Sequence, residues 1–531
     1  MANRWKYRNN IREPVLSILF SVFRYRVLWA EKVMTGKEVL AFFTIASFIY
    51  ILPFISADYA YVDDNWRLLL LAGDDWRNAG RIFIEIFVKF LTFNNATLNI
   101  FPFPLLVATL ALALAMSRLT FLYFPKPDFT ACLVVLPILC SPFFIGNITY
   151  QYDGPGMMLA VVAAIYAMTC TFERGTFRRL LAVLLVTATL SLYQLSISVF
   201  VGLCLIEFVW NVRSGRAANE TLHVLAQRGL QLMLGGGLYY LTTFQMISNP
   251  RGGLILSDHA WPEIVIARME YSLENISQLV TAGNLYLVLF LVLSAGAGLG
   301  VVIKTVFSLE GGWKKIVPIL MLLVCVVPAM IVCVPGTMLF LVEQPQNARN
   351  YMGFSTVLVF LFILSWEFLG RTWKVLRLLL IIPVLCMFSF CYAYGQVIIA
   401  KKELETAMAT FVAYDINRTK GFWGGEVLYY IGAPSTGNWL PKGYHAMSYM
   451  PTLRFILSDD NALLHPHFLT RQGINNVVDG KRAAFDAATS DGKIYVRVVD
   501  RKFYSFYVTE AGNFIVMKDI TDPESYVEKP R

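Results

Sequence analysis

The stretch YVDDNWRLLLLAGDDWRNAGR, residues 61–81, follows the first long apolar segment of the chain and contains four aspartates and three arginines. Charges at this density are unfavourable inside a hydrocarbon layer. The stretch therefore predicts the place where a membrane helix ends and a polar loop begins. The role of its aspartates depends on the side of the bilayer that this loop faces, so the topology comes first.

The rest of the chain has the composition of a polytopic membrane protein. Of its 531 residues, 57% are apolar and only 15% are charged. Apolar runs of about 17 to 25 residues can cross a bilayer as helices, and the chain holds about eleven such runs. We therefore predict an α-helical transmembrane domain over residues 39–398. Its spans are residues 39–56, 98–117, 130–147, 155–172, 180–192, 195–211, 229–247, 284–303, 316–340, 352–370 and 378–398, with a weak break between the fifth and the sixth.

The connections between the predicted spans alternate along the chain: one is rich in Lys and Arg, and the next is poor in them. The N-terminal segment 1–38 and every second loop hold 22 of the 45 basic residues, whereas the other loops hold seven. Basic loops stay in the cytoplasm, so we expect residues 1–38 to form a basic cytoplasmic N-terminus. The first span then acts as an uncleaved anchor, and residues 399–531 form an extracytoplasmic tail.

Composition also excludes several functional classes. The net charge of +9 follows from the basic cytoplasmic loops, so it does not indicate a nucleic-acid partner. No phosphate-binding loop or dinucleotide fingerprint occurs, which argues against a nucleotide donor in the cytoplasm. All eight cysteines lie within predicted spans, so none is available for an extracytoplasmic disulfide or metal site.

The outer loop 57–97 contains an acidic motif followed by an amphipathic segment. In residues 81–93, Arg81, Glu85 and Lys89 share one helical face, opposite a row of Ile and Phe side chains. This pattern is typical of a helix that lies in the membrane interface, although a short helix packed in the protein core would give the same pattern. An interfacial helix would hold the acidic motif near the membrane surface.

Asp63 and Asp64 form the first of two acidic pairs in this loop. A carboxylate near a lipid phosphate can have its pKa adjusted to accept a proton from an acceptor hydroxyl. Adjacent carboxylates cannot both point at one atom, so we expect one to act as the base and the other to position or bind. The alternative is that the pair lies in a solvated loop. For the second pair, Asp74 and Asp75, the simpler interpretation is a repeat of the first pair's sequence without a chemical role.

Two more outer breaks carry polar groups that suit a sugar. Asp153, with Gln151 and Tyr150, lies in the sequence NITYQYDGPG, residues 147–156, which is also ordinary turn chemistry. Tyr193 and Gln194 lie at the break between the fifth and sixth spans. They are candidates for hydrogen bonds to a sugar or for capping helix ends.

The last outer loop contains a single basic residue, Arg349, in the sequence EQPQNARNY, residues 343–351. A guanidinium group at the end of a span suits phosphate oxygens, and a pairing with Glu343 is the alternative. His259 has no second histidine at metal-binding spacing, and the HPH sequence at residues 465–467 lacks further ligands. We therefore assign no metal site by motif.

From residue 399 onward the composition changes to that of a soluble domain. The sequence predicts a helix over residues 401–418, strands over 427–432 and 493–500, and a hairpin over 503–520. A small α/β or α+β domain fits this length. It could shape an acceptor site or act as a stabilising cap.

Together these segments resemble a known family. An acidic pair after the first helix, an interfacial helix, a late outer arginine and an extracytoplasmic tail look like the GT-C class of polyprenyl-phosphate-sugar glycosyltransferases. More narrowly, the motifs VDDNWR, YQYDGPGMMLA, SLYQLS and PQNARNYMGF resemble the serotype-converting O-antigen glucosyltransferases of temperate phages of enteric bacteria.

The resemblance implies a multi-pass protein of the bacterial inner membrane that acts on the periplasmic side. Its implied activity is transfer of a glucosyl group, with inversion, from undecaprenyl-phosphate-glucose to lipid-linked O-antigen, and it depends on a separate flippase and donor synthase. The resemblance further implies that Asp63 or Asp64 is the base and that Arg349, with Arg67 or Arg81, holds the donor phosphate. Many GT-C enzymes use a divalent cation, and the motifs leave this open.

Two alternative functions share the predicted topology. A flippase or transporter of lipid-linked sugars is expected to carry charged or broken-helix sites near the bilayer midplane, whereas here the acids and the arginine gather on one outer face. An O-antigen polymerase or ligase is expected to use paired arginines in large periplasmic loops in place of an acidic pair.

Overall fold

The computed structural model describes residues 32–69, 76–95, 97–170, 175–248, 253–308, 313–342, 347–432, 440–457, 464 and 466–518. Most of the predicted basic N-terminus lies outside these residues, as do Asp74, Asp75, Glu343 and His465.

Most of the chain is helical, and seven described helices are long and apolar enough to cross a membrane. They are α3 (Gly36–Ala57), α6 (Phe103–Tyr123), α12 (Ile197–Arg213), α15 (Leu285–Phe307), α16 (Trp313–Cys333), α17 (Phe354–Thr372) and α18 (Ile381–Arg418). A bent pair of segments over Phe129–Cys140 and Pro142–Ile148, which contains α7 (Phe129–Val135), α8 (Pro137–Cys140) and α9 (Ile145–Ile148), raises the count to eight if it forms one span. The membrane character is thus supported, and the count of eleven spans stays a prediction.

The other predicted spans also fall on helices, but these are shorter or more polar. They are α10 (Asp153–Thr169), α11 (Thr176–Leu192) and α13 (Ala218–Leu241). The weak break between the fifth and sixth spans is confirmed, because α11 ends at Leu192 and α12 begins at Ile197. Three further helices lie in the loops: α4 (Asp64–Arg67), α5 (Ile82–Thr92) and α14 (Trp261–Ser277).

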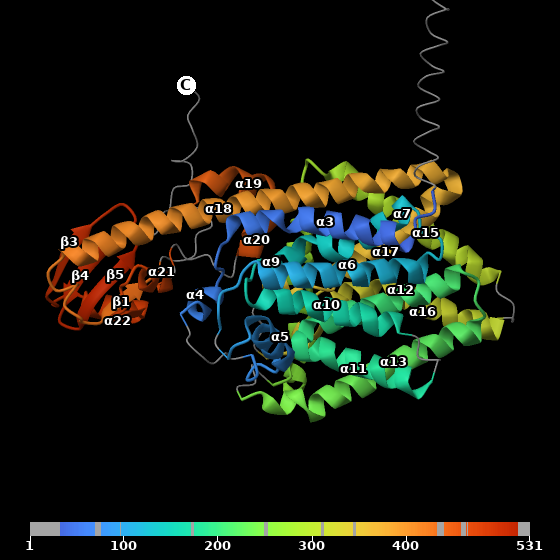
Figure 1. The fold of residues 1–531 in the computed structure, drawn as a ribbon, viewed down its shortest axis with the longest axis horizontal. Helices are drawn as coiled ribbons and strands as arrows, with labels where there is room; N and C mark the ends of the chain where they lie inside the picture. Colours follow the sequence, from blue (N-terminus) through green and yellow to red (C-terminus); the bar gives the residue numbers. More distant parts are fainter. Residues whose placement is uncertain are drawn as a thin grey trace, which may run out of the picture.

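Helix α10 lies at the centre of the bundle, between α6, α11 and α12 (Figure 1). Nearly all of its side chains are buried, and many are Gly, Ala or Met. At Gly156 a Cβ atom would lie 2.5 Å from Cγ1 of Ile84 in α5. The absence of a side chain at this position therefore lets α5 pack directly on α10, close to the N-terminus of α10.

Helix α18 connects the bundle to the C-terminal domain. At 38 residues and a rise of 1.5 Å per residue it is about 57 Å long, almost twice the thickness of a hydrocarbon core of about 30 Å. It packs along α3 and then projects beyond the bundle (Figure 1). The helix passes through residue 399 without a break, so the predicted helix over residues 401–418 is its second half.

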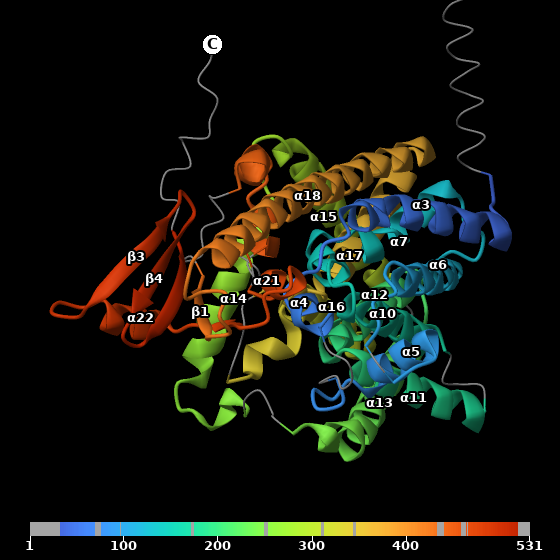
Figure 2. The same ribbon diagram turned by 60° about the vertical axis from the view of Figure 1, so that its left-hand side comes forward.

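The C-terminal domain contains a mixed five-stranded sheet with the order β2-β1-β5-β4-β3. Its strands are β1 (Leu428–Ile431), β2 (Val477–Asp479), β3 (Tyr495–Asp500), β4 (Tyr504–Thr509) and β5 (Gly512–Met517). The predicted strands and the hairpin are confirmed, and β1 is parallel to both β2 and β5. The domain also contains four short helices: α19 (Tyr444–Tyr449), α20 (Thr452–Ile456), α21 (His467–Arg471) and α22 (Arg482–Ala488). Figure 2 shows α21 beside α4, where the C-terminal domain meets the acidic motif.

Candidate active site

Asp64 ties the end of α3 to the segment that precedes α10. Its carboxylate accepts hydrogen bonds from the backbone N–H groups of Tyr61 at 3.0 Å, Gln151 at 2.8 Å and Tyr152 at 3.1 Å. The side chain is 0% exposed. Burial raises the pKa of Asp64 to about 7, in spite of the three N–H donors that favour the ionised form. Asp64 is therefore placed to hold two distant loops together.

Asp63, the neighbouring acid, points to a more open environment. Its side chain is 39% exposed, and its Oδ2 atom lies 4.0 Å from Nη1 of Arg349. The same Nη1 atom donates a hydrogen bond of 2.6 Å to the Tyr150 hydroxyl. The backbone carbonyl of Arg349 accepts from the side-chain amide of Asn147 at 3.1 Å. The fold thus brings Arg349 to the acidic pair from almost three hundred residues away.

Arg67 is the most enclosed of the three arginines predicted to bind phosphate. It is only 5% exposed, and its guanidinium group lies between the rings of Trp66 and Trp76, 4.5 Å from each ring centroid. Its Nε atom is 3.4 Å from Oδ2 of the buried Asp153. Neither Nε nor Nη1 of Arg67 has a hydrogen-bond partner among the described residues. With Nε directed at Asp153, Nη1 is left as a buried donor that an anionic ligand could use.

Asp153 also contacts the other side of the cluster. It accepts a hydrogen bond of 2.5 Å from the Trp76 indole and lies 3.9 Å from Nη1 of Arg81. The guanidinium of Arg81 covers the Tyr193 ring at 4.8 Å, and its Nε donates to Gln194 at 3.4 Å. Tyr150, Asp153, Tyr193 and Gln194 were predicted to bind sugar, and in the structure each of them contacts an arginine.

Helix α5 carries the predicted amphipathic pattern. Glu85 pairs with Lys89 at 2.7 Å and with Arg77 at 3.0 Å, while Ile84 and Val88 face inward. Several large apolar side chains of the helix and its C-terminal end are exposed instead: Phe83, Ile86, Phe90 and Phe93. An exposed apolar face beside the site agrees with the interfacial prediction and shows that only the opposite face of α5 is packed in the core.

The C-terminal domain supplies a residue that was not predicted. Arg471 of α21 donates a hydrogen bond of 2.7 Å to the side-chain oxygen of Asn65, which lies next to Asp64. Burial lowers the pKa of Arg471. No sequence pattern links residues 65 and 471, so this contact could not have been found without the fold.

Helix α18 supplies two further unpredicted contacts. The buried Glu405 accepts hydrogen bonds from Lys401 and from the Tyr59 hydroxyl, both at 2.8 Å. Lys402 donates to the backbone carbonyl of Asp58 at 2.6 Å. The sequence KKELE, which places Lys401 four residues before Glu405, was the one available signal for these contacts.

A polar cavity of about 240 Å³ opens between these elements. Its walls come from the loop after α3, from the segment before α10 and from the C-terminal domain. The lining residues are Asp58, Tyr59, Ala60, Leu68, Asn99, Gln151, Lys402, Thr406, Phe468, Arg471 and Gln472. Gln151 donates to Asp58 at 3.0 Å, while its side-chain oxygen has no hydrogen-bond partner within the described ranges. Of the predicted sugar-binding residues, Gln151 is thus the one that lines this cavity.

The structure brings all ten predicted site residues to one end of the helical bundle, while their chemical roles stay predictions. Asp74, Asp75 and the alternative Arg349–Glu343 pairing lie outside the described residues. Within the described part of the chain, no three His, Cys, Asp or Glu side chains are grouped so that they could hold a metal ion.

The sequence profile of the family described as Glucosyl transferase GtrII matches residues 52–366. The chain belongs to the GtrII glucosyl transferase family. The match confirms the family resemblance inferred from the motifs, and it contains all ten predicted site residues. The GtrII match ends before α18, so Glu405 and Arg471 lie outside it.

A related sequence comes from Salmonella phage P22. It is an uncharacterized 55.3 kDa protein in the gtrB 5′ region, 28% identical over 170 residues, which are 32% of this chain and 35% of the phage protein. The similarity therefore spans about one third of that relative. No solved structure matches the chain.

Proposed function

We propose that this GtrII family protein is an inner-membrane glycosyltransferase that modifies O-antigen on the periplasmic side and so converts the serotype. Its donor is undecaprenyl-phosphate-glucose, and its acceptor is the lipid-linked O-antigen. A separate synthase makes the donor and a separate flippase delivers it. Family membership supports the glucosyl group, and the positive-inside pattern supports a cytoplasmic N-terminus and a periplasmic C-terminus.

The observation that carries the proposal is the pairing of a half-exposed carboxylate, Asp63, with the guanidinium of Arg349 at 4.0 Å. This places a proton acceptor beside a phosphate-binding group, as transfer from a lipid phosphate requires. Sequence-distant residues meet here at the end of the apolar bundle, where a lipid-linked donor can enter from the membrane.

The donor phosphate binds to the arginines of the cluster. Arg349 offers a guanidinium fork next to Asp63, and Arg67 has a buried Nη1 donor without a hydrogen-bond partner among the described residues. Guanidinium groups match phosphate oxygens in geometry and charge. The same groups stabilise the negative charge that develops on the phosphate as it leaves. Arg81, held by Tyr193 and Gln194, adds positive charge at the rim.

Asp63 acts as the base and Asp64 as a positioning residue. A base must reach the proton of the acceptor hydroxyl, and Asp63 is the exposed member of the pair, whereas all contacts of the buried Asp64 that we describe are backbone N–H groups. As the acceptor oxygen attacks the anomeric carbon, its proton passes to Asp63. The bond between the anomeric carbon and the phosphate oxygen breaks, and its electron pair leaves with the phosphate. One in-line displacement inverts the anomeric centre.

The acceptor sugar occupies the cavity between the bundle and the C-terminal domain. The groups that line it, including Asp58, Gln151 and Arg471, offer donors and acceptors for sugar hydroxyls. The C-terminal domain thereby forms part of the acceptor site in addition to stabilising the fold.

Mass analysis of lipopolysaccharide tests this proposal. Cells that contain the donor synthase and the flippase should add a hexose to each O-antigen repeat when they express the wild-type chain, and they should not when they express Asp63→Asn. Asp491→Asn, which changes an exposed aspartate in the C-terminal domain, is the matched control and should retain the modification. Unmodified lipopolysaccharide in the wild-type cells would contradict the proposed activity.

A further inference from the structure

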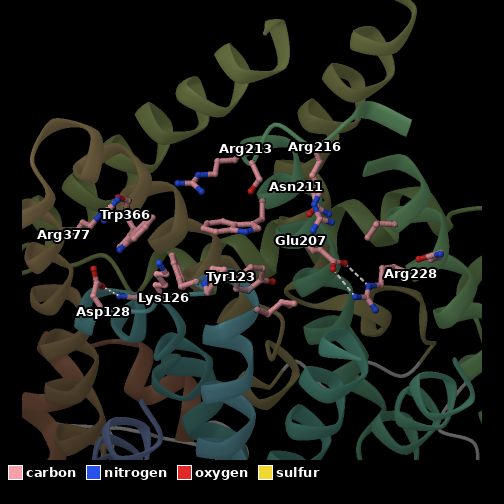
Figure 3. Close-up of a pocket in the computed structure, with 18 residues that line it drawn as sticks. Tyr123, Lys126, Asp128, Glu207, Asn211, Arg213, Arg216, Arg228, Trp366 and Arg377 are labelled. Carbon is pink, nitrogen blue, oxygen red and sulfur yellow. Dashed lines mark hydrogen bonds and ion pairs between the residues drawn. The ribbon is translucent and has the colours of Figure 1, made fainter. Parts of the chain in front are cut away.

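A second and larger cavity, of about 730 Å³, lies at the opposite end of the helical bundle. Figure 3 shows its lining residues. Helix α10 relates the two sites. Asp153 at its first residue belongs to the candidate active site, whereas Arg228 beside the second cavity donates to the carbonyl of Met168 at 2.6 Å, next to its last residue. Seventeen helical residues separate the two ends by about 25 Å. The second cavity is therefore distinct from the site proposed for sugar transfer.

The cavity is strongly basic. Five Lys and Arg residues line it, against two acids, Asp128 and Glu207. Two of these arginines are neutralised within the protein: Arg228 pairs with Glu207 at 2.8 Å, and Arg213 pairs with Glu367 at 2.5 Å. The rest of the positive charge comes from Lys126, Arg216 and Arg377.

Lys126 and Arg216 are exposed cations at the rim of the cavity. No hydrogen bond or ion pair joins either side chain to another residue in the described ranges. Both side chains are labelled in Figure 3, on opposite sides of the cavity. They provide positive charge that the protein itself does not neutralise.

A buried amide gives independent evidence of a ligand. Asn211 lines the cavity and is 4% exposed, yet its Nδ2 atom has no hydrogen-bond partner among the residues that the structure describes. Buried polar groups in native proteins are nearly always hydrogen-bonded. An acceptor oxygen of a bound molecule would satisfy this donor.

The walls of the cavity indicate that the ligand is amphiphilic. Aromatic side chains line it between the basic groups, and they include Tyr123, Trp210 and Trp366. The guanidinium of Arg377 covers the Trp366 ring at 3.4 Å. Trp and Tyr side chains beside Lys and Arg are typical of the head-group layer of a membrane, and basic pockets between membrane helices suit phosphate head groups.

We propose that this cavity binds the phosphate head group of an anionic phospholipid. The phosphate oxygens accept from Lys126, Arg216 and the amide of Asn211, and the aromatic residues contact the glycerol and the upper acyl chains. The loops that contribute these residues are rich in Lys and Arg, which places the cavity at the cytoplasmic leaflet, where anionic lipids are abundant. A volume of 730 Å³ accommodates a head group together with the first part of its chains.

Native mass spectrometry of the full-length protein in detergent tests this proposal, with phosphatidylglycerol, phosphatidylcholine and inorganic phosphate as probes. Phosphatidylglycerol should bind saturably and much more tightly than phosphatidylcholine. The double variant Lys126→Gln, Arg216→Gln should weaken its binding by about 5-fold for each charge removed, hence about 25-fold in total. Both residues are exposed, so the substitutions should leave folding unchanged.

The control variant Lys420→Gln, Lys481→Gln removes two exposed charges from the C-terminal domain, beyond the end of α18, and should bind the lipid as the wild type does. Asn211→Asp places a carboxylate where the proposed phosphate binds, so this variant should bind phosphatidylglycerol more weakly than the wild type does. Equal affinity for the two lipids, or unchanged binding by the double variant, would overturn the proposal. Displacement of the lipid by millimolar inorganic phosphate would show a site for free phosphate and would overturn the lipid assignment.

Discussion

Replacing Arg67 by Met would remove the cation that lies between two tryptophans and beside Asp153. Methionine keeps the apolar stem in contact with both rings, so the main loss is the buried ion pair at 3.4 Å. Removing one partner of such a pair costs about 3–5 kcal/mol of stability. Asp153 retains the Trp76 indole and Arg81 at 3.9 Å, so we expect the lower end, about 3 kcal/mol.

Unfolding in mixed micelles, titrated with sodium dodecyl sulfate, would measure this loss. Asp153→Asn alone should also destabilise, because it leaves Arg67 buried without a carboxylate. In the double variant the two losses should overlap, which gives a coupling free energy of about 1.5–3 kcal/mol. If the loss of stability in the double variant equals the sum of the two single losses to within about 0.5 kcal/mol, the ion pair does not stabilise the site. Arg67→Met should also raise the KM for the lipid-linked donor by about tenfold or more, since it removes a group that is proposed to bind the donor phosphate.

Three further predictions concern Gly156, Arg471 and Asp64. Gly156→Ala should destabilise the protein by about 1–3 kcal/mol, because the new Cβ would lie 2.5 Å from Cγ1 of Ile84. Adding Ile84→Ala should recover part of this loss of stability in the same titration. If the losses of the two single variants simply add, the packing of α5 on α10 is contradicted. Arg471→Gln should raise the KM for the acceptor more than the KM for the donor, because Arg471 lines the cavity proposed to hold the acceptor and donates to Asn65 at 2.7 Å. A change confined to the donor KM would contradict this assignment. For Asp64, burial raises the pKa from 3.8 to about 7. Between these two pH values the folded state therefore binds more protons than the unfolded state. The stability that the protonated Asp64 contributes is present at low pH and is lost as the pH rises through about 7. The difference in free energy of unfolding between wild type and Asp64→Asn should therefore fall between pH 5 and pH 8, and a constant difference would show that Asp64 does not titrate in this range.

Much of the helical architecture was predictable because a bilayer requires long apolar segments, and these are visible in the sequence. The break before α12 and the helix over residues 401–418 were predicted correctly, whereas the continuity of that helix with the last predicted span was not. The number of spans was harder to predict, because α10 has only 17 residues and α13 carries a buried ion pair through Arg228. Such helices are stabilised by their neighbours in the bundle, which hydropathy does not describe.

The sequence predicted which residues lie at the same end of the bundle, but it did not predict the contacts among them. Position at the outer ends of spans indicated which residues could meet, and the motifs of the family narrowed the choice. Hydropathy could not show that Arg67 lies between two tryptophans, or that Tyr150 holds Arg349, because these contacts depend on the packing of α10 and its preceding loop. The contribution of Arg471 was missed for the same reason, since it depends on how the C-terminal domain folds back on α4.

In the proposed mechanism, Asp63 accepts the proton of the acceptor hydroxyl while Arg349 holds the donor phosphate. The most direct measurement is the rate of glucosyl transfer in proteoliposomes that contain undecaprenyl-phosphate-glucose and lipid-linked O-antigen, together with donor binding by the same preparation. Asp63→Asn should lower the transfer rate by about 10²- to 10⁴-fold while it binds the donor as tightly as the wild type does. A transfer rate within a fewfold of the wild type would contradict the role of Asp63 as the base.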